Sequence, residues 1–473
     1  MDRLSLASIG RVPEQHRPRV DPRDVSIGVV HLGIGAFTRA HQAVVLERAM
    51  AATGSATWGV VGVSQRSPAA SDALASQDGL YTVTDINDSG AGALRVVGAL
   101  REAVHAGTSP DDVVERIANP ATRMVTVTVT EKGYHCVPGG WELDLGHPGV
   151  RSDLAGRPPG TVVGTIAAGL ARRRHEDAPI DVLSCDNLPG NGTVLRGLVM
   201  TFLERSGDTA TRSWAEDKVR FPSSMVDRMV PASTETTRER AAHIIGLTDA
   251  CAVAGEPFLQ WVVESDFAAA PPPLEAGGAT LTDNVEPWER LKLRVLNASH
   301  SVLAWHGVLR GLPEIALAVA DPGLRHHVET LALVDMAPLM TPPPGATVPG
   351  YLEQVLRRCA NQGLHHRTLQ VASDGTAKVG PRLLEPAVES LQAGRLPEHI
   401  ASAVAAWWLV TTRDTDFTGR PMVVDDPTAA TLLADRPTLA VALERLAPAL
   451  QDHPEFARLV DTSVEQLSRQ TRP

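Results

Sequence analysis

A strand-like run that ends in a glycine turn and continues into a helical pattern restricts the folds open to the start of this chain. Residues 26–32 read Ser-Ile-Gly-Val-Val-His-Leu, a largely apolar run typical of a buried parallel strand. Gly33 and Gly35 follow, and a helical pattern runs from Arg39 to Met50. Glycines at such a turn let the backbone approach a pyrophosphate, whose charge is met by amide groups at the helix N-terminus. The stretch therefore predicts the first unit of a dinucleotide-binding domain.

The usual fingerprint of such a unit is incomplete in two places. Thr38 stands where the third glycine of Gly-x-Gly-x-x-Gly would lie. A second buried run over 57–64 ends at Ser64, where these domains place an acidic residue on the adenosine ribose. The chain instead reads Gln-Arg-Ser over 65–67. Arg66 could face a 2'-phosphate or extend into solvent, so these residues leave the choice between NAD and NADP open.

Two further predicted strands end in polar loops. The buried run 124–129 leads into Thr-Glu-Lys-Gly, and the run 180–184 leads into a turn that begins Asp-Asn. Because open parallel sheets bind ligands beyond the carboxyl ends of their strands, Glu131 and Asn187 are both expected to border the ligand crevice. The alternatives are a local ion pair between Glu131 and the adjacent lysine, and a left-handed backbone position for Asn187.

A polar helix face is the next candidate site. Residues 289–300 read Glu-Arg-Leu-Lys-Leu-Arg-Val-Leu-Asn-Ala-Ser-His, with apolar side chains at helical spacing. At roughly 100° per residue, four polar side chains fall at about 0°, 60°, 80° and 140° and share one face: Lys292, Glu289, His300 and Asn297. Burying such groups is costly unless they hydrogen-bond one another or a ligand. This face predicts a site; the alternative is an amphipathic helix whose polar side is solvated.

Six motifs, taken in order, carry a resemblance to a known family. The helix just described contains Lys-x4-Asn-x2-His from Lys292. The other five are GIGAFTRAHQ from Gly33, TVTEKGYHC from Thr128, SCDNLPGNG from Ser184, FPSSMVDRMVP from Phe221 and EPFLQWVVESDF from Glu256. Together they resemble the mannitol dehydrogenase family of polyol-specific long-chain dehydrogenases, over most of the chain. Mannitol 2-dehydrogenase and fructuronate reductase belong to that family.

The resemblance implies α/β plus α architecture. A Rossmann-type NAD(P)-binding domain is expected over 1–280 and a mainly α-helical substrate and catalytic domain over 281–473. Pro271–Pro273 and Gly277–Gly278 mark the expected boundary, because such runs interrupt regular structure.

The implied reaction is a metal-free hydride transfer between a nicotinamide and a secondary alcohol of an acyclic polyol, of the mannitol/fructose type. Lys292 would be the base, with its pKa lowered from about 10.4 by desolvation. Asn187 and Asn297 would donate to the reacting oxygen. His300 would position a neighbouring hydroxyl, and Glu289 would pass the proton to water.

The resemblance also implies binding residues, and it favours NAD over NADP. The cofactor would contact Gly33, Gly35, Ala36 and Phe37 of the glycine motif, and the places of Arg66 and Glu131 at strand ends add those two residues. The substrate would contact Val226, Asp227, Arg367 and Lys378.

Residues 366–370 read His-Arg-Thr-Leu-Gln, a pattern that resembles the uronate reductases, whereas mannitol dehydrogenases carry arginine in place of Gln370. The alternative function is therefore a fructuronate reductase (D-mannonate oxidoreductase), whose substrate carboxylate needs cations such as Arg367 or Lys378. A weaker alternative is a catalytically silent NAD-binding sensor, which would have no use for a base.

Composition excludes several other classes of function. The net charge of -11 and the lack of a basic cluster beyond residues 172–174 argue against nucleic acid as a partner. The four cysteines are far apart and show no CxxC pairing, so neither a zinc site nor a disulfide framework is expected. The longest apolar stretch, near residues 400–410, is about half the ~20 residues that span a bilayer. The sequence predicts a cytoplasmic enzyme without a membrane segment, as a monomer or weak homodimer.

Overall fold

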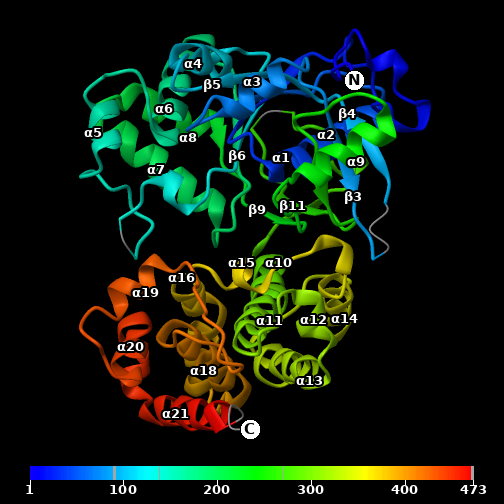
Figure 1. Ribbon diagram of the computed structural model, residues 1–473. Coiled ribbons are helices and arrows are strands. Elements are labelled where there is room, and N and C mark those ends of the chain that lie inside the picture. Colours follow the sequence, from blue (N-terminus) through cyan, green and yellow to red (C-terminus); the bar gives the residue numbers. More distant parts are fainter. Residues whose placement is uncertain (89–91, 138, 269, 470–473) are drawn as a thin grey trace. The chain divides into compact units, whose positions relative to one another are not determined.

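The computed structural model describes residues 1–88, 92–137, 139–268 and 270–469. The chain divides into two compact units, one formed by Met1–Ile86 and Ala91–Glu286, the other by Asn87–Gly90 and Pro287–Pro473. The first combines strands with helices, and the second is built from helices (Figure 1). The predicted α/β plus α fold class is confirmed.

A six-stranded parallel sheet forms the centre of the first unit, in the order β5-β2-β1-β6-β7-β8. The chain moves outward from β1 to β2 and β5, and then continues on the other side of β1 with β6. The order therefore reverses between β1 and β6, and such a reversal is where open parallel sheets bind ligands. The strands are β1 (Ile27–Leu32), β2 (Gly59–Ser64), β5 (Leu100–His105), β6 (Met124–Val127), β7 (Ile180–Ser184) and β8 (Val219–Arg220).

Helices cover both faces of this sheet, because its strands are apolar on both sides. On one face, Val30 and Val125 pack in a core with α4, α6 and α7. On the other face, Val29 and Met124 pack with α2 and α3. The helices of this unit are α1 (Ala36–Ala40), α2 (Gln42–Thr53), α3 (Ala69–Ala75), α4 (Pro110–Ala118), α5 (Pro148–Leu154), α6 (Val162–Arg173), α7 (Asn191–Arg205), α8 (Thr209–Lys218) and α9 (Glu235–Ile245).

Two three-stranded sheets complete the first unit, in the orders β10-β3-β4 and β12-β11-β9. Strands β3 and β4 pair antiparallel, with Tyr81 opposite Val97, as the alternating pattern over 80–97 predicts. The predicted turn at Ser89 and Gly90 lies outside the described residues. The strands are β3 (Tyr81–Asp85), β4 (Leu94–Val97), β9 (Ser224–Asp227), β10 (Val253–Gly255), β11 (Gln260–Glu264) and β12 (Thr280–Thr282).

The first 24 residues are an integral part of the first unit. Their polar and proline-containing composition predicts a lead-in arm, and that prediction is wrong. Leu4, Ile9 and Val12 are buried in a core with Leu80 and Val96. A few apolar side chains at irregular spacing are enough to attach the segment, and no periodic pattern marks them in advance.

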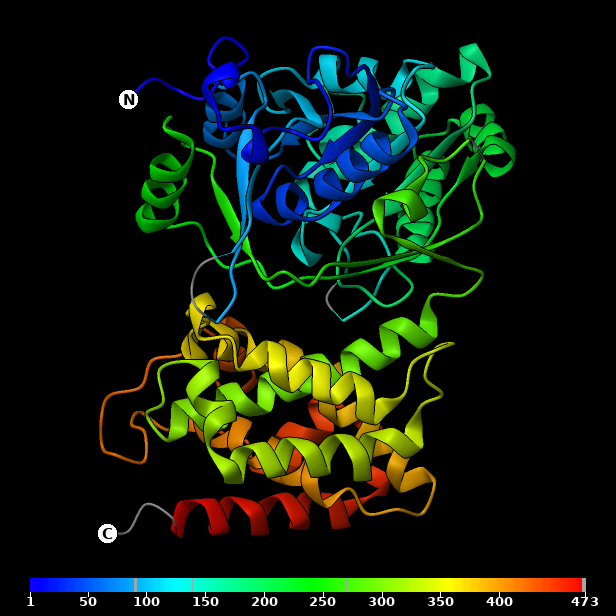
Figure 2. The ribbon, with the colours of Figure 1, turned by 90° about the vertical axis from the view of Figure 1, so that its right-hand side faces the viewer.

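The second unit packs its helices around α11 and α18, whose side chains are buried over most of their length. Helix α21, in red, runs along this unit (Figure 2) and packs against α18, and its Phe456 and Val460 are buried. Within the described residues, no helix has the length and apolar character needed to cross a membrane. The helices are α10 (Glu286–Leu291), α11 (Ala298–Leu309), α12 (Ile315–Ala320), α13 (Pro322–Thr330), α14 (Val348–Cys359), α15 (Thr368–Ala372), α16 (Gly375–Val379), α17 (Glu385–Gln392), α18 (Glu398–Thr412), α19 (Pro427–Leu432), α20 (Leu439–Leu446) and α21 (Pro454–Arg469), with π-helical turns η6 (Lys292–Asn297), η7 (Leu331–Met336) and η10 (Gly380–Leu384).

Candidate active site

The two glycines of the turn after β1 have different physical roles. Gly33 has φ +110°, and a Cβ built there would lie 1.9 Å from the carbonyl oxygen of Thr128, so the fold itself requires glycine. Gly35 has φ -73° at the N-cap of α1, and none of the described heavy atoms beyond its neighbours lies within 4 Å of a Cβ built on it. Neither backbone conformation nor packing calls for glycine at 35. Open space at that point fits the close approach of a dinucleotide's phosphates.

A buried histidine fixes this turn to the adjacent strand. His31 lies 2.7 Å from the Thr126 hydroxyl through Nδ1 and 2.8 Å from the Thr128 hydroxyl through Nε2. The Thr128 hydroxyl in turn donates to the Gly33 carbonyl at 2.8 Å. Burial lowers the pKa of His31 to about 4, so the ring is neutral near pH 7. The network holds β1 and β6 together where the strand order reverses.

The predicted cofactor residues follow the carboxyl ends of three neighbouring strands. Ala36 and Phe37 begin α1 after β1, and the Phe37 ring stacks on His41 with centroids 5.0 Å apart. Arg66 is exposed just beyond β2, and Glu131 is exposed at the start of a 3-10 turn after β6. The fold thus brings these residues to one edge of the sheet, as the strand pattern predicts.

Asn187 lies at the same edge, three residues beyond the end of β7, and its side chain is exposed. The neighbouring Asp186 is partly buried and accepts hydrogen bonds from the N–H groups of Val129 and Thr130, in the loop that carries Glu131. Sequence reasoning passed over Asp186 as part of a turn. A carboxylate two residues beyond a buried strand was the available signal.

The segment Val226–Arg228 is buried instead of lying on the surface. Val226 and Asp227 belong to β9, which pairs antiparallel with β11. Two adjacent opposite charges would also be typical of a surface ion pair, and the burial of Asp227 and Arg228 contradicts that interpretation. Arg228 is 6% exposed, and its guanidinium donates to Asp85 at 2.6 Å and to the Glu256 carbonyl at 2.9 Å.

In the second unit, the predicted helix over 289–300 is present, but it is not a continuous α-helix. Glu289 lies in α10, Lys292 and Asn297 are the first and last residues of η6, and His300 lies in α11. The Ala298 N–H donates to a carbonyl five residues earlier, the bond that defines a π turn. The predicted angles between these side chains assume a regular α-helix, so they are wrong for the segment between Lys292 and Asn297. Such wide turns occur frequently at functional sites.

Basic side chains surround His300. Its ring meets the ring of His366 edge-on, with centroids 5.6 Å apart. Burial first, and then nearby positive charge, holds the pKa of His300 well below its ordinary value. The cations that contribute to this shift are Arg358, Arg382 and Lys378, and the basic ring of His366 also contributes. Arg367 is exposed at the start of α15.

Two of these cations also hold the local backbone in place. The Lys378 ammonium donates to the carbonyls of Val371, at 3.0 Å, and Ser373. Arg382, in η10, donates to the Asn297 carbonyl at 3.2 Å and to the Ser301 hydroxyl at 2.9 Å. The sequence motifs did not single out Arg382. It lies four residues beyond Lys378, one helical turn away.

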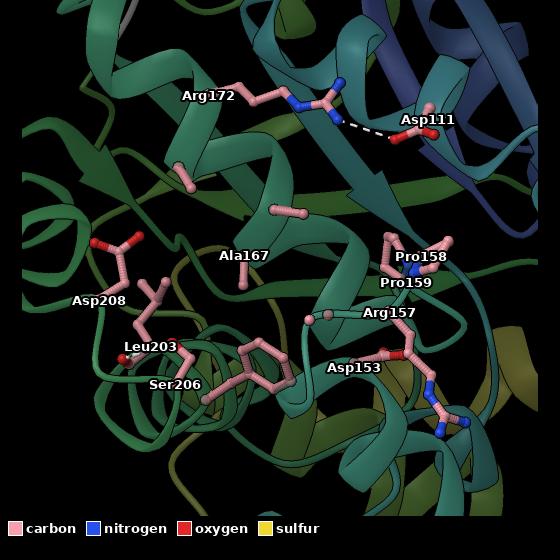
Figure 3. A pocket seen from close by; sticks show the side chains of 15 residues that line it. Asp111, Asp153, Arg157, Pro158, Pro159, Ala167, Arg172, Leu203, Ser206 and Asp208 are labelled. Atoms are coloured by element: carbon pink, nitrogen blue, oxygen red, sulfur yellow. Dashed lines mark hydrogen bonds and ion pairs between the residues drawn. The ribbon is translucent and has the colours of Figure 1, made fainter.

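A separate hollow of about 350 Å³ lies in the first unit, and none of the predicted site residues lines it (Figure 3). It is formed between α6, α7 and the segment 153–159. Asp153, Ala167 and Leu203 are among its lining residues. The candidate site therefore stays at the carboxyl edge of the sheet, away from this hollow.

The predicted residues form two sets. The glycine turn, Arg66, Glu131, Asn187 and Asp227 belong to the first unit. The second unit contains Glu289, Lys292, Asn297, His300, Arg367 and Lys378. Each unit therefore supplies one half of the predicted chemistry, with nucleotide-binding features in the first and the base in the second.

Comparisons with known proteins agree with this division of the chain. Residues 27–276 match the family described as the mannitol dehydrogenase Rossmann domain, and residues 284–468 match the mannitol dehydrogenase C-terminal domain. D-mannonate oxidoreductase of Escherichia coli is 36% identical over 420 residues, covering 88% of this chain and 86% of the relative. Mannitol 2-dehydrogenase of Phaeosphaeria nodorum is 33% identical over 479 residues, covering 99% and 84%.

A solved structure extends the similarity to three dimensions. The ternary complex of Pseudomonas fluorescens mannitol 2-dehydrogenase with NAD and D-mannitol has a TM-score of 0.90 and 30% sequence identity. The match covers 99% of this chain and 97% of that one. The chain is therefore an oxidoreductase that belongs to the mannitol dehydrogenase family.

Proposed function

We propose that this protein interconverts a secondary alcohol of an acyclic polyol and the corresponding ketose, with NAD as the hydride acceptor. The observation that carries the proposal is the placement of Lys292 and Asn297 at the two ends of one π turn, with His300 three residues beyond. A base and neutral donors are what alcohol oxidation needs, because the hydroxyl proton must leave as hydride departs. The relative that was solved with NAD and D-mannitol supports the same chemistry.

Each side chain of the second unit has a defined task in this proposal. Neutral Lys292 removes the hydroxyl proton, and Glu289, one turn earlier, passes that proton toward water. Asn297 donates to the oxygen as negative charge develops on it, together with Asn187 of the first unit. His300 is neutral because its pKa is depressed, so it can orient a neighbouring hydroxyl without adding charge. A bound nicotinamide supplies the hydride chemistry.

The turn after β1 is proposed to hold the cofactor's phosphates, and its two glycines provide a matched test. Gly33→Ala is expected to destabilise the first unit by roughly 1–3 kcal/mol, because φ +110° and the Thr128 carbonyl both oppose a side chain. Gly35→Ala is expected to leave the melting temperature near the wild-type value and to weaken NAD binding. Thermal melting and NAD titration of both variants check this. Normal NAD affinity in Gly35→Ala would place the phosphates elsewhere.

Cofactor choice is expected to favour NAD, although an acidic residue is missing at the end of β2. Arg66 is exposed there and is the available partner for a 2'-phosphate. If NADP is also used, Arg66→Ala should lower kcat/KM for NADP and leave kcat/KM for NAD within about twofold, since one phosphate contact would be lost. Steady-state kinetics with both cofactors measure the ratio. A clear wild-type preference for NADP would contradict the proposal.

A hexuronate is the second candidate substrate, and the surroundings of His300 favour it. Arg358, Arg382 and Lys378 place positive charge beside His300, as recognition of a substrate carboxylate would require. The similarity to D-mannonate oxidoreductase agrees with this alternative.

A substrate panel distinguishes the two candidates. Mannitol, arabinitol and sorbitol are offered for oxidation, and fructose and fructuronate for reduction, with each cofactor and with a chelator present. The proposed function predicts turnover of a polyol or of fructose. Reduction of fructuronate alone would select the second candidate, and no turnover of any of these compounds would contradict both.

A further inference from the structure

Asp186 links the two loops that leave the carboxyl ends of β6 and β7. Its Oδ2 accepts from the Val129 N–H at 2.9 Å and from the Tyr134 hydroxyl at 2.8 Å. Its Oδ1 accepts from the Thr130 N–H at 3.1 Å. One carboxylate at the end of β7 therefore fixes three groups of the loop that follows β6.

The loop that Asp186 holds contains an unusual backbone. Thr130 has φ 65° and ψ 163°, a region that residues with a side chain rarely occupy. Such a conformation persists only where the surroundings enforce it. The bond from the Thr130 N–H to Asp186 acts directly on that peptide, and the bond from the Val129 N–H acts on the one before it. The carboxylate is thus placed to maintain the strained residue.

The backbone of Asp186 is itself held by residues at the end of β7 and at the start of α7. Its carbonyl accepts from the Asn191 amide at 2.9 Å, and its N–H donates to the Ser184 hydroxyl at 3.3 Å. The Ser184 hydroxyl also lies 2.6 Å from the Tyr134 hydroxyl. Both ends of the link are therefore anchored in the sheet and in the helix α7 that follows.

The two proposed site residues are the immediate neighbours of this link. Asn187 follows Asp186, and Glu131 follows Thr130; both side chains are exposed. The hydrogen bonds that hold the peptides of Asp186 and Thr130 therefore also position the backbone of Asn187 and Glu131.

We infer that Asp186 is a positioning residue, which sets the location of Asn187 relative to Glu131 by tying the β7 loop to the strained Thr130 peptide. This inference rests on the proposed function for its effect on rate, but the link itself can be measured separately. Asp186 does not touch the reacting atoms. It acts through Asn187, whose donor must meet the oxygen in the transition state.

Asp186→Ala tests the inference, with Asp153→Ala as a matched control. Asp153 is a buried carboxylate of the same unit that also accepts three bonds, from the Gly160 and Thr161 N–H groups and the Thr161 hydroxyl, but it lies at the hollow of Figure 3. In Asp186→Ala, kcat for polyol oxidation should fall on the order of 10²-fold, because small displacements of a catalytic donor have effects of that size. In Asp153→Ala, the melting temperature should fall while kcat stays within about threefold of wild type, since the lost bonds lie away from the crevice.

A second substitution separates positioning from general damage. Glycine adopts the Thr130 backbone without strain, so Thr130→Gly added to Asp186→Ala should recover part of the lost kcat. If Asp186→Ala fails to fold, Asp186→Asn, which keeps the shape and one acceptor, replaces it and should lower kcat by a smaller factor. A kcat within threefold of wild type in the folded Asp186 variant, or no recovery in the double variant, overturns the inference.

Hydrogen exchange gives the readout that does not depend on activity. Peptides covering 128–134 and 186–188 should exchange faster in Asp186→Ala and at the wild-type rate in Asp153→Ala. Unchanged exchange in both variants overturns the link. If the wild-type enzyme turns over no compound of the substrate panel, the proposed function fails, and accelerated exchange in Asp186→Ala would still support the link.

Discussion

Replacing Lys292 with alanine is expected to lower kcat for alcohol oxidation by about 10²- to 10⁴-fold, the usual contribution of a positioned general base. The wild-type rate of oxidation should rise with pH as the lysine loses its proton, and the rate of ketone reduction should fall, because reduction needs the protonated form. The variant should lose both dependences. Initial rates in both directions across pH, for wild type and variant, measure the effect.

Two controls separate loss of the base from loss of the fold. Lys218, at the end of α8, forms a surface ion pair with Asp177 at 3.3 Å, so Lys218→Ala should keep wild-type rates. Binding of NAD should survive in Lys292→Ala, because the glycine turn belongs to the other unit. An added primary amine should restore part of the activity. Near-normal turnover in Lys292→Ala would mean that the base is a different residue.

Acidification from pH 6.5 toward 4 is expected to lower the free energy of unfolding through two buried histidines. Burial lowers the pKa of His31, in the first unit, and of His327, in the second, to about 4 each. Below pH 6.5, the ordinary pKa of histidine, these two rings bind protons in the unfolded chain, whereas in the folded chain they bind protons only near pH 4. The contribution of these histidines to the free energy of unfolding is therefore complete above pH 6.5 and is lost as the pH falls from 6.5 to 4. Each histidine accounts for roughly 3 kcal/mol over its whole window.

Urea unfolding at pH 7.5 and pH 5, followed by circular dichroism, measures this loss. His327→Gln removes one titrating ring, so the difference in unfolding free energy between the two pH values should shrink in that variant. His243→Gln is the control, because His243 is exposed on α9. An identical pH difference in wild type and His327→Gln would show that this ring does not titrate as expected.

The elements that sequence patterns predict well are those defined by local burial. The run 180–184 is strand β7 in its full predicted length, and β3 and β4 pair antiparallel, as the alternating pattern over 80–97 predicts. The turn at Gly33 lies directly after such a strand, so its place at the sheet edge also followed from the sequence. The roles assigned to Lys292 and Asn187 came instead from resemblance to a family, and they remain proposals.

Features that depend on distant partners could not be predicted. The ion pair of Arg228 with Asp85 joins residues 143 positions apart, and nothing near Arg228 in the sequence indicates that partner. The link from Asp186 to Thr130 spans 56 positions. The wide turn between Lys292 and Asn297 is defined by its backbone hydrogen bonds. The spacing of apolar side chains in the sequence does not distinguish that bonding from the bonding of a regular α-helix.

In terms of sequence change, that wide turn is equivalent to one extra residue inserted into an α-helix. Deleting a single residue between 292 and 297 would return the segment to α-helical bonding. The wide turn takes up the extra residue within itself, so Glu289 and His300 would keep nearly the same angular relation after such a deletion. A π turn places residues five apart at about one turn's spacing, whereas five residues of a regular α-helix separate two side chains by about 140°. The bonding of this segment therefore brings Lys292 and Asn297 closer to one line along the helix than a regular α-helix of the same sequence would.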